Sequence, residues 1–160
     1  MTIRFAEMRD IPGIIALLRQ VGEVHHQIRP DLFRGGAQKY DEAALEALLA
    51  DPDRPILVAE LEGSVAGHAF CIRQENRDDP VLCDRKILYI DDICVEERLR
   101  GRGIATALYD AVLAYAREEG FHSVTLNVWC GNENAMRFYE HMGMRRRSIT
   151  MEVPLEEKQC

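Results

Sequence analysis

Apolar residues recur along this chain with two different periods. Between residues 11 and 24 they lie three or four positions apart, which predicts an amphipathic helix. Asp10 can cap this helix, and Pro30 should end it near Ile28, because proline disfavours helical geometry in the residue before it. The same spacing predicts a second helix, capped by Asp41, and two further helices over residues 104–119 and 133–142.

Short runs of apolar and β-branched residues predict the strands. They cover residues 3–6, 56–60, 64–73, 86–95 and 123–129, and the alternation of Ile149, Met151 and Val153 predicts a last strand. Because a helix crosses between strands 86–95 and 123–129, these two should lie parallel. The order β-α-α-β-β-β-α-β-α-β predicts one mixed α/β domain.

Length and charge restrict the classes of function. A chain of 160 residues with 47% hydrophobic content can bury one core, so residues 1–160 are expected to form a single domain. The net charge of −7 argues against binding of DNA or RNA through phosphates and favours cationic small molecules. Apolar runs stay well short of the roughly 20 residues of a membrane span, so we expect a cytoplasmic protein without a membrane partner.

The cysteines and histidines lack metal-binding spacing. Five cysteines are scattered, without the CxxC pattern of zinc sites or the even number of a disulfide framework. His25 and His26 are adjacent, so they would not face each other on a helix. We therefore expect reduced thiols and no bound metal.

The segment from Arg98 to Gly103 places two glycines among three arginines, between a predicted strand and a predicted helix. The first N–H groups of that helix and its dipole would face the glycines, where a phosphate could approach the backbone. Ile104-Ala105 stands where a Walker A motif requires Lys and Ser or Thr, and Thr106 replaces the third glycine of a dinucleotide-binding motif. An ordinary turn with solvated arginines is the alternative.

Two stretches together resemble the GNAT superfamily of N-acetyltransferases. Residues 89–105 contain the Arg-x-x-Gly-x-Gly pattern of that family's pyrophosphate loop, and residues 132–144 contain Asn-x-x-Ala-x-x-Phe-Tyr-Glu-x-x-Gly, which matches its C-terminal half. The resemblance implies the GNAT fold, a mixed α/β fold with a central sheet splayed between the fourth and fifth strands and helices on both faces. Residues 1–54 would then bind the acceptor, and residues 55–153 would form the coenzyme A-binding core.

The resemblance implies acetyl-coenzyme A as the acyl donor. Its pyrophosphate would lie on the backbone amides of the glycine loop, and its pantetheine arm would run beside the end of the preceding strand like an added strand. The coenzyme-binding residues implied in this way are Ile93, Cys94, Val95, Arg98, Leu99, Arg100, Gly101, Arg102, Gly103, Ile104, Ala105, Thr106, Asn132, Asn134 and Tyr139.

Transfer of an acyl group to an amine needs a neutral amine, whereas an alkylammonium has a pKa of about 10.4. By resemblance, Asp91 takes the position of the base and Asp92 orients the acceptor or the base. Related enzymes carry Glu where Asp91 stands, so the proton could also pass through water, or Asp91 could simply bind the cation. A bulge near Asp92 would turn both side chains toward one slot, and a solvated pair at a strand end is the alternative.

Tyr139 matches the family's general acid, which protonates the departing thiolate of coenzyme A. It could instead be a core aromatic, because it shares an apolar helix face with Ala135, Phe138 and Met142. Cys94 reads as a small strand residue, since direct transfer needs no acyl-enzyme.

The acceptor pocket is assigned by resemblance to His25, His26, Asp31 and Phe33, together with Asp92. A primary amine on a small cationic molecule, such as a polyamine, an amino acid or an aminosugar, is the expected acceptor. Acetylation of a protein N-terminus or a lysine is the enzymatic alternative. A non-catalytic acyl-coenzyme A-binding domain is the alternative of another class. Because members of the family are often dimers, the resemblance also suggests a homodimer.

Overall fold

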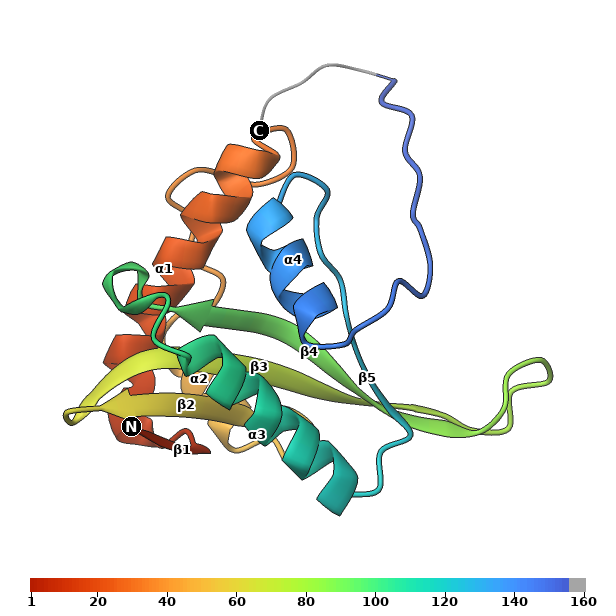
Figure 1. The fold of residues 1–160 in the computed structure, drawn as a ribbon, viewed down its shortest axis with the longest axis horizontal. Coiled ribbons are helices and arrows are strands. Elements are labelled where there is room, and N and C mark those ends of the chain that lie inside the picture. Colours follow the sequence, from red (N-terminus) through yellow and green to blue (C-terminus); the bar gives the residue numbers. More distant parts are fainter. Residues whose placement is uncertain (156–160) are drawn as a thin grey trace.

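The computed structural model describes residues 1–155, which contain one five-stranded sheet in the order β1-β2-β3-β4-β5 (Figure 1). Neighbouring strands are antiparallel except β4 and β5, which are parallel as predicted. The strands are β1 (Thr2–Phe5), β2 (Ile56–Leu61), β3 (Ser64–Asn76), β4 (Arg85–Val95) and β5 (Ser123–Leu126).

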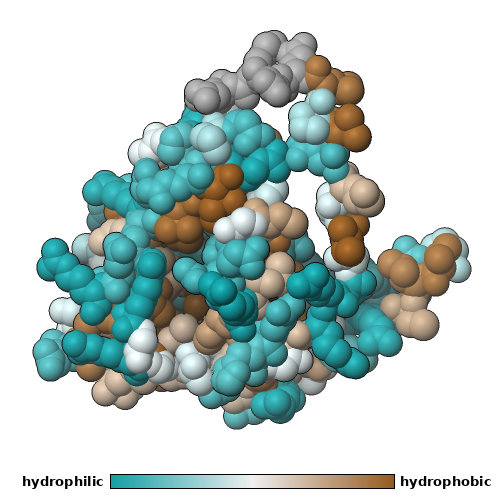
Figure 2. All heavy atoms as spheres, turned by 45° about the horizontal axis from the view of Figure 1, so that its top comes forward, coloured by the Kyte–Doolittle hydropathy of each residue, from teal (hydrophilic) through white to brown (hydrophobic). Residues whose placement is uncertain are grey.

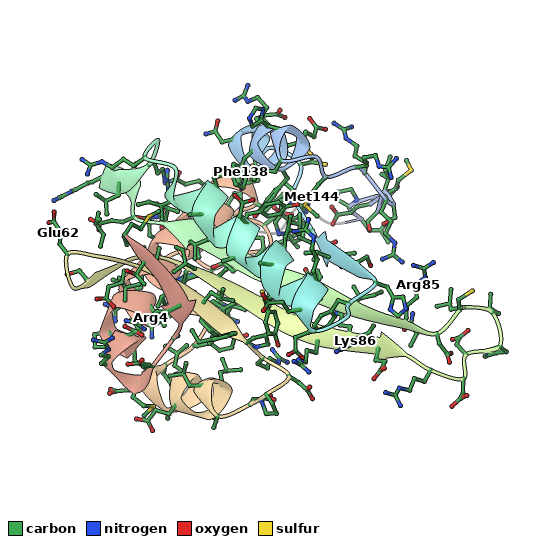
Figure 3. All side chains as sticks on the ribbon, turned by 60° about the horizontal axis from the view of Figure 1, so that its bottom comes forward. Arg4, Glu62, Arg85, Lys86, Phe138 and Met144 are labelled. Atoms are coloured by element: carbon green, nitrogen blue, oxygen red, sulfur yellow. The ribbon has the colours of Figure 1, made fainter. Side chains whose placement is uncertain are left out.

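Helices cover both faces of this sheet. On one face, α1 (Ile11–Ile28) and α2 (Glu42–Leu49) bury a cluster that includes Leu18, Leu45 and Phe70. On the other face, α3 (Ile104–Glu118) buries a second cluster, and Phe138 and Met144 pack against it from α4 (Glu133–His141) and the residues after it (Figure 3). Two short 3-10 helices, η1 (Met8–Asp10) and η2 (Glu97–Leu99), precede α1 and α3. The mixed α/β fold with helices on both faces is therefore confirmed.

The predicted cap of α2 is confirmed, whereas that of α1 is wrong. Asp41 Oδ1 accepts a hydrogen bond from the Ala44 N–H at 2.8 Å. Asp10 makes no side-chain cap to α1. Its carboxylate instead accepts from the backbone N–H of Glu7 at 2.8 Å and from both terminal nitrogens of Arg4 at 2.7 and 2.9 Å. The carboxylate lies over the preceding turn, where a guanidinium offers two charge-assisted hydrogen bonds.

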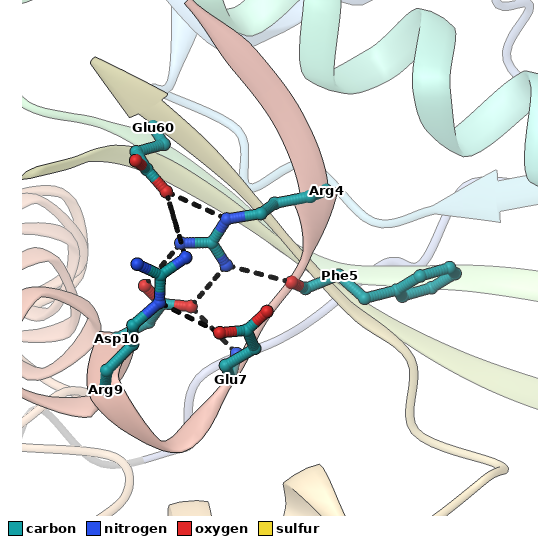
Figure 4. A network of polar contacts seen from close by, with 6 residues as sticks. All are labelled: Arg4, Phe5, Glu7, Arg9, Asp10 and Glu60. Carbon is teal, nitrogen blue, oxygen red and sulfur yellow. Dashed lines mark hydrogen bonds and ion pairs between the residues drawn. The ribbon is translucent and has the colours of Figure 1, made fainter. Parts of the chain in front are cut away.

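Arg4 fastens the first strand to its neighbours (Figure 4). Besides the fork on Asp10, its Nε donates to Glu60 of β2 at 2.9 Å. Asp10 is buried, with 4% of its surface exposed, and Arg4 holds the pKa of its carboxyl below the ordinary value. The pairing fixes where the chain enters α1, the helix that faces the site described below.

The last predicted strand is wrong in this structure. Residues 144–155 contain no strand, and Ile149, Met151 and Val153 are 80%, 91% and 80% exposed. β5 also ends at Leu126, although a strand as far as residue 129 was predicted. Both differences have one physical cause, since an extended segment becomes a strand only where a neighbouring strand pairs with it. Neither residues 127–129 nor residues 144–155 pair with a strand among the described residues.

Candidate active site

A β-bulge interrupts the pairing of β3 with β4 at the aspartate pair. Asp92 lies opposite Phe70 and Ile90 lies opposite Cys71, so Asp91 is an extra residue without a partner on β3. The parallel pairing of β4 with β5 covers Ile87 to Ile90 and stops just before the bulge. The sheet therefore splays between β4 and β5, as predicted, and the outer edge of β4 is open from the bulge onward.

A cavity of about 500 Å³ lies at this splay, with α1 on one side and α4 on the other. Both aspartates line it, so the bulge turns two successive side chains toward the same space. The other polar and aromatic residues that line it are His25, Phe33, Arg34, Gln38, Lys39, Tyr89, Asn127, Trp129, Asn132 and Tyr139.

The carboxylate of Asp92 is held by a buried histidine. His68 Nε2 lies 2.8 Å from Asp92 Oδ2, and the His68 side chain is 0% exposed against 12% for Asp92. A carboxylate without a proton can only accept hydrogen bonds, so we assign the ring proton to Nε2, which donates the hydrogen bond to Oδ2. Phe70 packs edge-on against the imidazole with ring centroids 4.9 Å apart. The ring fixes one oxygen of Asp92 and leaves the other for a ligand.

Asp91 has a different partner within the same cavity. Lys39, from the loop before α2, donates to Asp91 Oδ2 at 2.6 Å. Burial disfavours the charged lysine, but the hydrogen bond and the attraction of Asp91 outweigh it, so the Lys39 pKa is raised and the side chain is an ammonium at neutral pH. One of the two carboxylates is therefore already neutralised by the chain itself.

Tyr139 of α4 lies across the cavity from the bulge. Its ring packs against Tyr109 and Phe138, with centroids 6.2 and 5.1 Å away, so it is part of the core as well as of the cavity wall. Burial, and next the negative charge of Asp92, raise the pKa of its phenol. The phenol therefore keeps its proton at neutral pH and is available as a donor.

The glycine loop leaves its backbone accessible. Gly101 and Gly103 adopt left-handed φ angles of +76° and +78°, and a Cβ at either position would meet no atom within 4 Å. α3 begins directly after Gly103, so its first N–H groups face this open loop. Arg98, Arg100 and Arg102 are exposed, and within residues 1–155 none of them forms an ion pair. The loop therefore has open backbone and free charge, and its role as an anion site stays a prediction.

Gln20 of α1 joins the end of β4 to this loop. Its Nε2 donates to the Val95 carbonyl at 3.0 Å, and its Oε1 accepts from the Glu97 N–H at 3.0 Å. Neither Gln20 nor His68 was anticipated from the sequence. The only signal for His68 is a polar residue in the middle of an otherwise apolar strand.

The sequence profile described as the acetyltransferase (GNAT) family matches residues 23–144. The chain belongs to this family. Among curated GNAT-type relatives, an uncharacterized N-acetyltransferase of Mycobacterium bovis is 34% identical over 97 residues, which cover 61% of this chain and 56% of that protein. Human N-acetyltransferase 8B is 30% identical over 116 residues, covering 68% and 49% of the two chains. The chain thus spans about half the length of the curated relatives it matches.

A solved structure of similar length shows the same GNAT fold throughout. A tetramutant of the BH1408 protein from Bacillus halodurans is 31% identical, with a TM-score of 0.92 over 97% of this chain and 100% of that one. The agreement includes the mixed open sheet and the helices on both faces.

Only some of the residues expected by resemblance in the acceptor pocket line the cavity. His25 and Phe33 line the cavity and contact each other, with ring centroids 5.0 Å apart. His26 and Asp31 do not line it: His26 Nδ1 lies 2.6 Å from the Phe33 carbonyl oxygen, and Asp31 pairs with Arg29. The two aspartates, Tyr139, His25 and Phe33 come together at the cavity, and His26 and Asp31 lie outside its lining.

The residues expected to hold coenzyme A also differ in their surroundings. Ile93 and Asn132 line the cavity, and Asn132 caps α4 by accepting from the Ala135 N–H at 3.2 Å. Asn134 is exposed and accepts from Arg137. Cys94 is buried beneath α1, with its Sγ 3.6 Å from the Leu17 carbonyl, and burial raises its pKa to about 12, so it is no thiolate nucleophile at neutral pH.

The described residues were also compared with the requirements of a metal site and of a membrane-spanning helix. Among residues 1–155, no group of three or more His, Cys, Asp or Glu side chains is arranged to hold a metal ion. None of the helices in this part of the chain combines the length and the apolar character needed to cross a membrane.

Proposed function

We propose that this chain moves an acetyl group from acetyl-coenzyme A directly to a primary amine of a small cationic acceptor. The proposal rests above all on one observation: the bulge brings two carboxylates into a cavity that also holds the protonated phenol of Tyr139, next to the open edge of β4. Acid and base candidates thus face one space large enough for a small molecule.

Family membership supports the donor, because acetyl-coenzyme A is the acyl donor of GNAT acetyltransferases. Its pyrophosphate would lie on the N–H groups around Gly101 and Gly103 and at the start of α3, where no side chain blocks the approach. The pantetheine arm would pair with the edge of β4 that β5 leaves open after Ile90. Ile93 lies on that edge and also lines the cavity.

The acceptor must lose a proton before it attacks. Asp92 is the better placed base, since His68 holds one of its oxygens and Asp91 is already paired with Lys39. Asp92 takes the proton from the ammonium, the amine nitrogen bonds to the thioester carbonyl carbon, and the carbon–sulfur bond breaks. Tyr139 donates its phenolic proton to the departing thiolate, whose thiol has an ordinary pKa of about 8.5. The attacking nitrogen releases its second proton to water as the amide forms, and the phenolate of Tyr139 regains a proton from water.

The size and lining of the cavity favour a small acceptor with a positive charge. His25, Phe33 and Trp129 form an aromatic wall, with the Phe33 and Trp129 rings edge to face at 5.3 Å. Aromatic faces and aspartates suit an ammonium group of a polyamine, an amino acid or an aminosugar. A homodimer and a cytoplasmic location complete the proposal.

Incubation of the purified chain with acetyl-coenzyme A and a panel of primary amines tests the proposal, with release of coenzyme A thiol as the readout. We expect turnover with small cationic amines and none with their N-acetylated forms. Turnover with peptide N-termini or peptide lysines alone would assign the chain to protein acetylation. Binding of coenzyme A in a calorimeter without turnover of any amine or peptide would leave only a binding domain.

A further inference from the structure

One ion pair in the wall of the cavity has no task in the proposed reaction. Lys39 and Asp91 both line the cavity, and Lys39 Nζ lies 2.6 Å from Asp91 Oδ2. The side chain of Lys39 is 47% exposed and that of Asp91 is 19% exposed, so the pair lies at the surface of the cavity. A primary ammonium held by a carboxylate is the arrangement that an acceptor must adopt before it loses its proton. The chain therefore places an amine of its own where an acceptor is expected.

The loop before α2 is fastened on both sides of Lys39. Gln38 accepts a hydrogen bond from Arg19 Nε of α1 at 2.8 Å and donates to the Tyr40 carbonyl at 2.7 Å. The Tyr40 ring stacks on Phe70 of β3, with centroids 5.9 Å apart. The position of Lys39 beside the bulge thus follows from contacts of its two neighbours with α1 and with the sheet.

Lysine is rare in this chain, although hydrophilic residues cover much of the face drawn in Figure 2. Of the 20 basic residues in the sequence, 17 are arginines and three, Lys39, Lys86 and Lys158, are lysines. A guanidinium keeps its proton in proteins, whereas an ammonium becomes a nucleophile when it loses one proton. Among the described residues that line the cavity, Lys39 carries the only primary amine.

We propose that this chain acetylates its own Lys39 at Nζ, within a single copy, when acetyl-coenzyme A is bound. Self-acetylation rests on the proposed function, because it uses the same donor, the same cavity and the same acid. Since the amine belongs to the chain itself, no acceptor has to be captured from solution, and a well-oriented intramolecular amine reacts as if it were at very high concentration.

The groups that this step needs are already in the cavity. Lys39 is protonated at neutral pH, since its pKa is raised, so Asp91 first takes one proton from the ammonium. Nζ then bonds to the thioester carbonyl carbon, the carbon–sulfur bond breaks, and Tyr139 gives its proton to the departing thiolate. Nζ loses its second proton to water as the amide forms, and the phenolate of Tyr139 regains a proton from water. The acetylated lysine carries no charge, so Asp91 becomes a free carboxylate in the cavity.

The test incubates the full chain with acetyl-coenzyme A that carries a deuterated acetyl group, without any amine, and analyses each lysine by peptide mass spectrometry. We expect label on Lys39 and none on Lys86, whose ammonium donates to the Glu119 carbonyl at 2.6 Å outside the cavity. Absence of label on Lys39, or equal labelling of both lysines, overturns the proposal. Unlabelled acetyl already on Lys39 of the purified chain supports the proposal if a Tyr139→Phe chain lacks it, and overturns it if that chain carries it too.

Two variants separate catalysis from chemical acetylation of an exposed lysine. Asp91→Asn removes the carboxylate that takes the proton, and Tyr139→Phe removes the acid. Each should slow the labelling of Lys39 about 100-fold, and circular dichroism checks that both variants fold. Labelling of Lys39 at the native rate in either variant contradicts the proposed step.

A mixture of two chains tests whether the transfer stays within one copy. The native chain is mixed with an affinity-tagged Tyr139→Phe chain, and the tagged chain is then separated and analysed. Lys39 of the native chain should carry label and Lys39 of the tagged chain should carry none. Equal label on both chains means transfer between copies, which overturns the proposal.

A parallel sample with the panel of primary amines separates the failure of this proposal from the failure of the proposed function. Turnover of an amine, with no label on Lys39 when amines are left out, overturns self-acetylation and leaves the proposed function standing. Binding of coenzyme A with neither amine turnover nor label on Lys39 overturns both.

Discussion

His68 Nε2 donates a hydrogen bond of 2.8 Å to Asp92 Oδ2, from a ring that is wholly buried. The two residues come from neighbouring strands, and the β-bulge places Asp92 opposite Phe70, two positions beyond the histidine. The orientation of the candidate base therefore depends on a side chain that no substrate can touch.

Replacement of Asp92 by Asn should lower kcat about 100-fold or more, since general base catalysis contributes about 10²–10⁴-fold. Asp91→Asn is the matched control, because Asp91 is paired with Lys39, and it should change KM for the amine more than kcat. Steady-state release of coenzyme A measures both. A larger loss of kcat in Asp91→Asn would assign the base to Asp91 instead.

Replacement of His68 by Ala should lower kcat about tenfold, because loss of one charge-assisted hydrogen bond is worth about 1.5 kcal/mol. His68→Gln keeps an N–H donor and should recover most of that loss. KM for acetyl-coenzyme A should stay unchanged in both variants. If Ala and Gln lower only the melting temperature, the histidine serves packing alone.

Replacement of Tyr139 by Phe should lower turnover about 100-fold, while the affinity for acetyl-coenzyme A changes little, because the phenol donates a proton only as the thiolate departs. Tyr109→Phe is a suitable control, since that buried ring contacts Tyr139 without lining the cavity. Stopped-flow turnover and calorimetry separate the two effects. An equal loss of affinity would place Tyr139 in binding or packing.

Replacement of Gly103 by Val should abolish coenzyme A binding, because a side chain there would block approach to the backbone. Gly63→Val is matched to it: Gly63 has a φ angle of +79°, lies in open space and sits in the β2–β3 turn, far along the chain from the loop. Both variants should lose similar thermal stability. Retained binding in Gly103→Val would contradict the assignment of the loop.

Replacement of Asp10 by Ala should destabilise the fold by about 3 kcal/mol, because it leaves the guanidinium of Arg4 without its buried partner. Arg9→Ala removes an exposed guanidinium that pairs with Glu7 at 2.9 Å and with Glu60 at 3.5 Å, and it should cost less than about 1 kcal/mol. The folded-state pKa of Asp10 lies below its unfolded value of 3.8, so its contribution is complete above pH ~4 and is lost as the pH falls below that. Urea unfolding at pH 7 and pH 3 should show a smaller difference between Asp10→Ala and the native chain at pH 3.

Local sequence signals predicted the parts of the site that depend on local geometry. The glycine loop, the Asp41 and Asn132 caps and the ends of α1 and α4 follow from residues a few positions apart. The contacts of His68 and Lys39 with the aspartates do not, because they join residues 24 and 52 positions apart. Only the register of β3 on β4 and the path of the loop before α2 bring them together.

The strand predicted over residues 149–153 shows a second limit of prediction from sequence. The alternation of Ile149, Met151 and Val153 predicts a strand, but the structure has no strand there. An alternating pattern does not say which edge of the sheet, if any, a segment pairs with.

Because Asp91 is an extra residue in β4, the number of residues in this strand decides which side chains face the cavity. Deleting Asp91 would restore continuous pairing between β3 and β4, and Asp92, the carboxylate that remains, would follow Ile90 directly and point to the opposite face of the strand from it. The pair of carboxylates at the cavity therefore depends on the number of residues in β4 as well as on their identity.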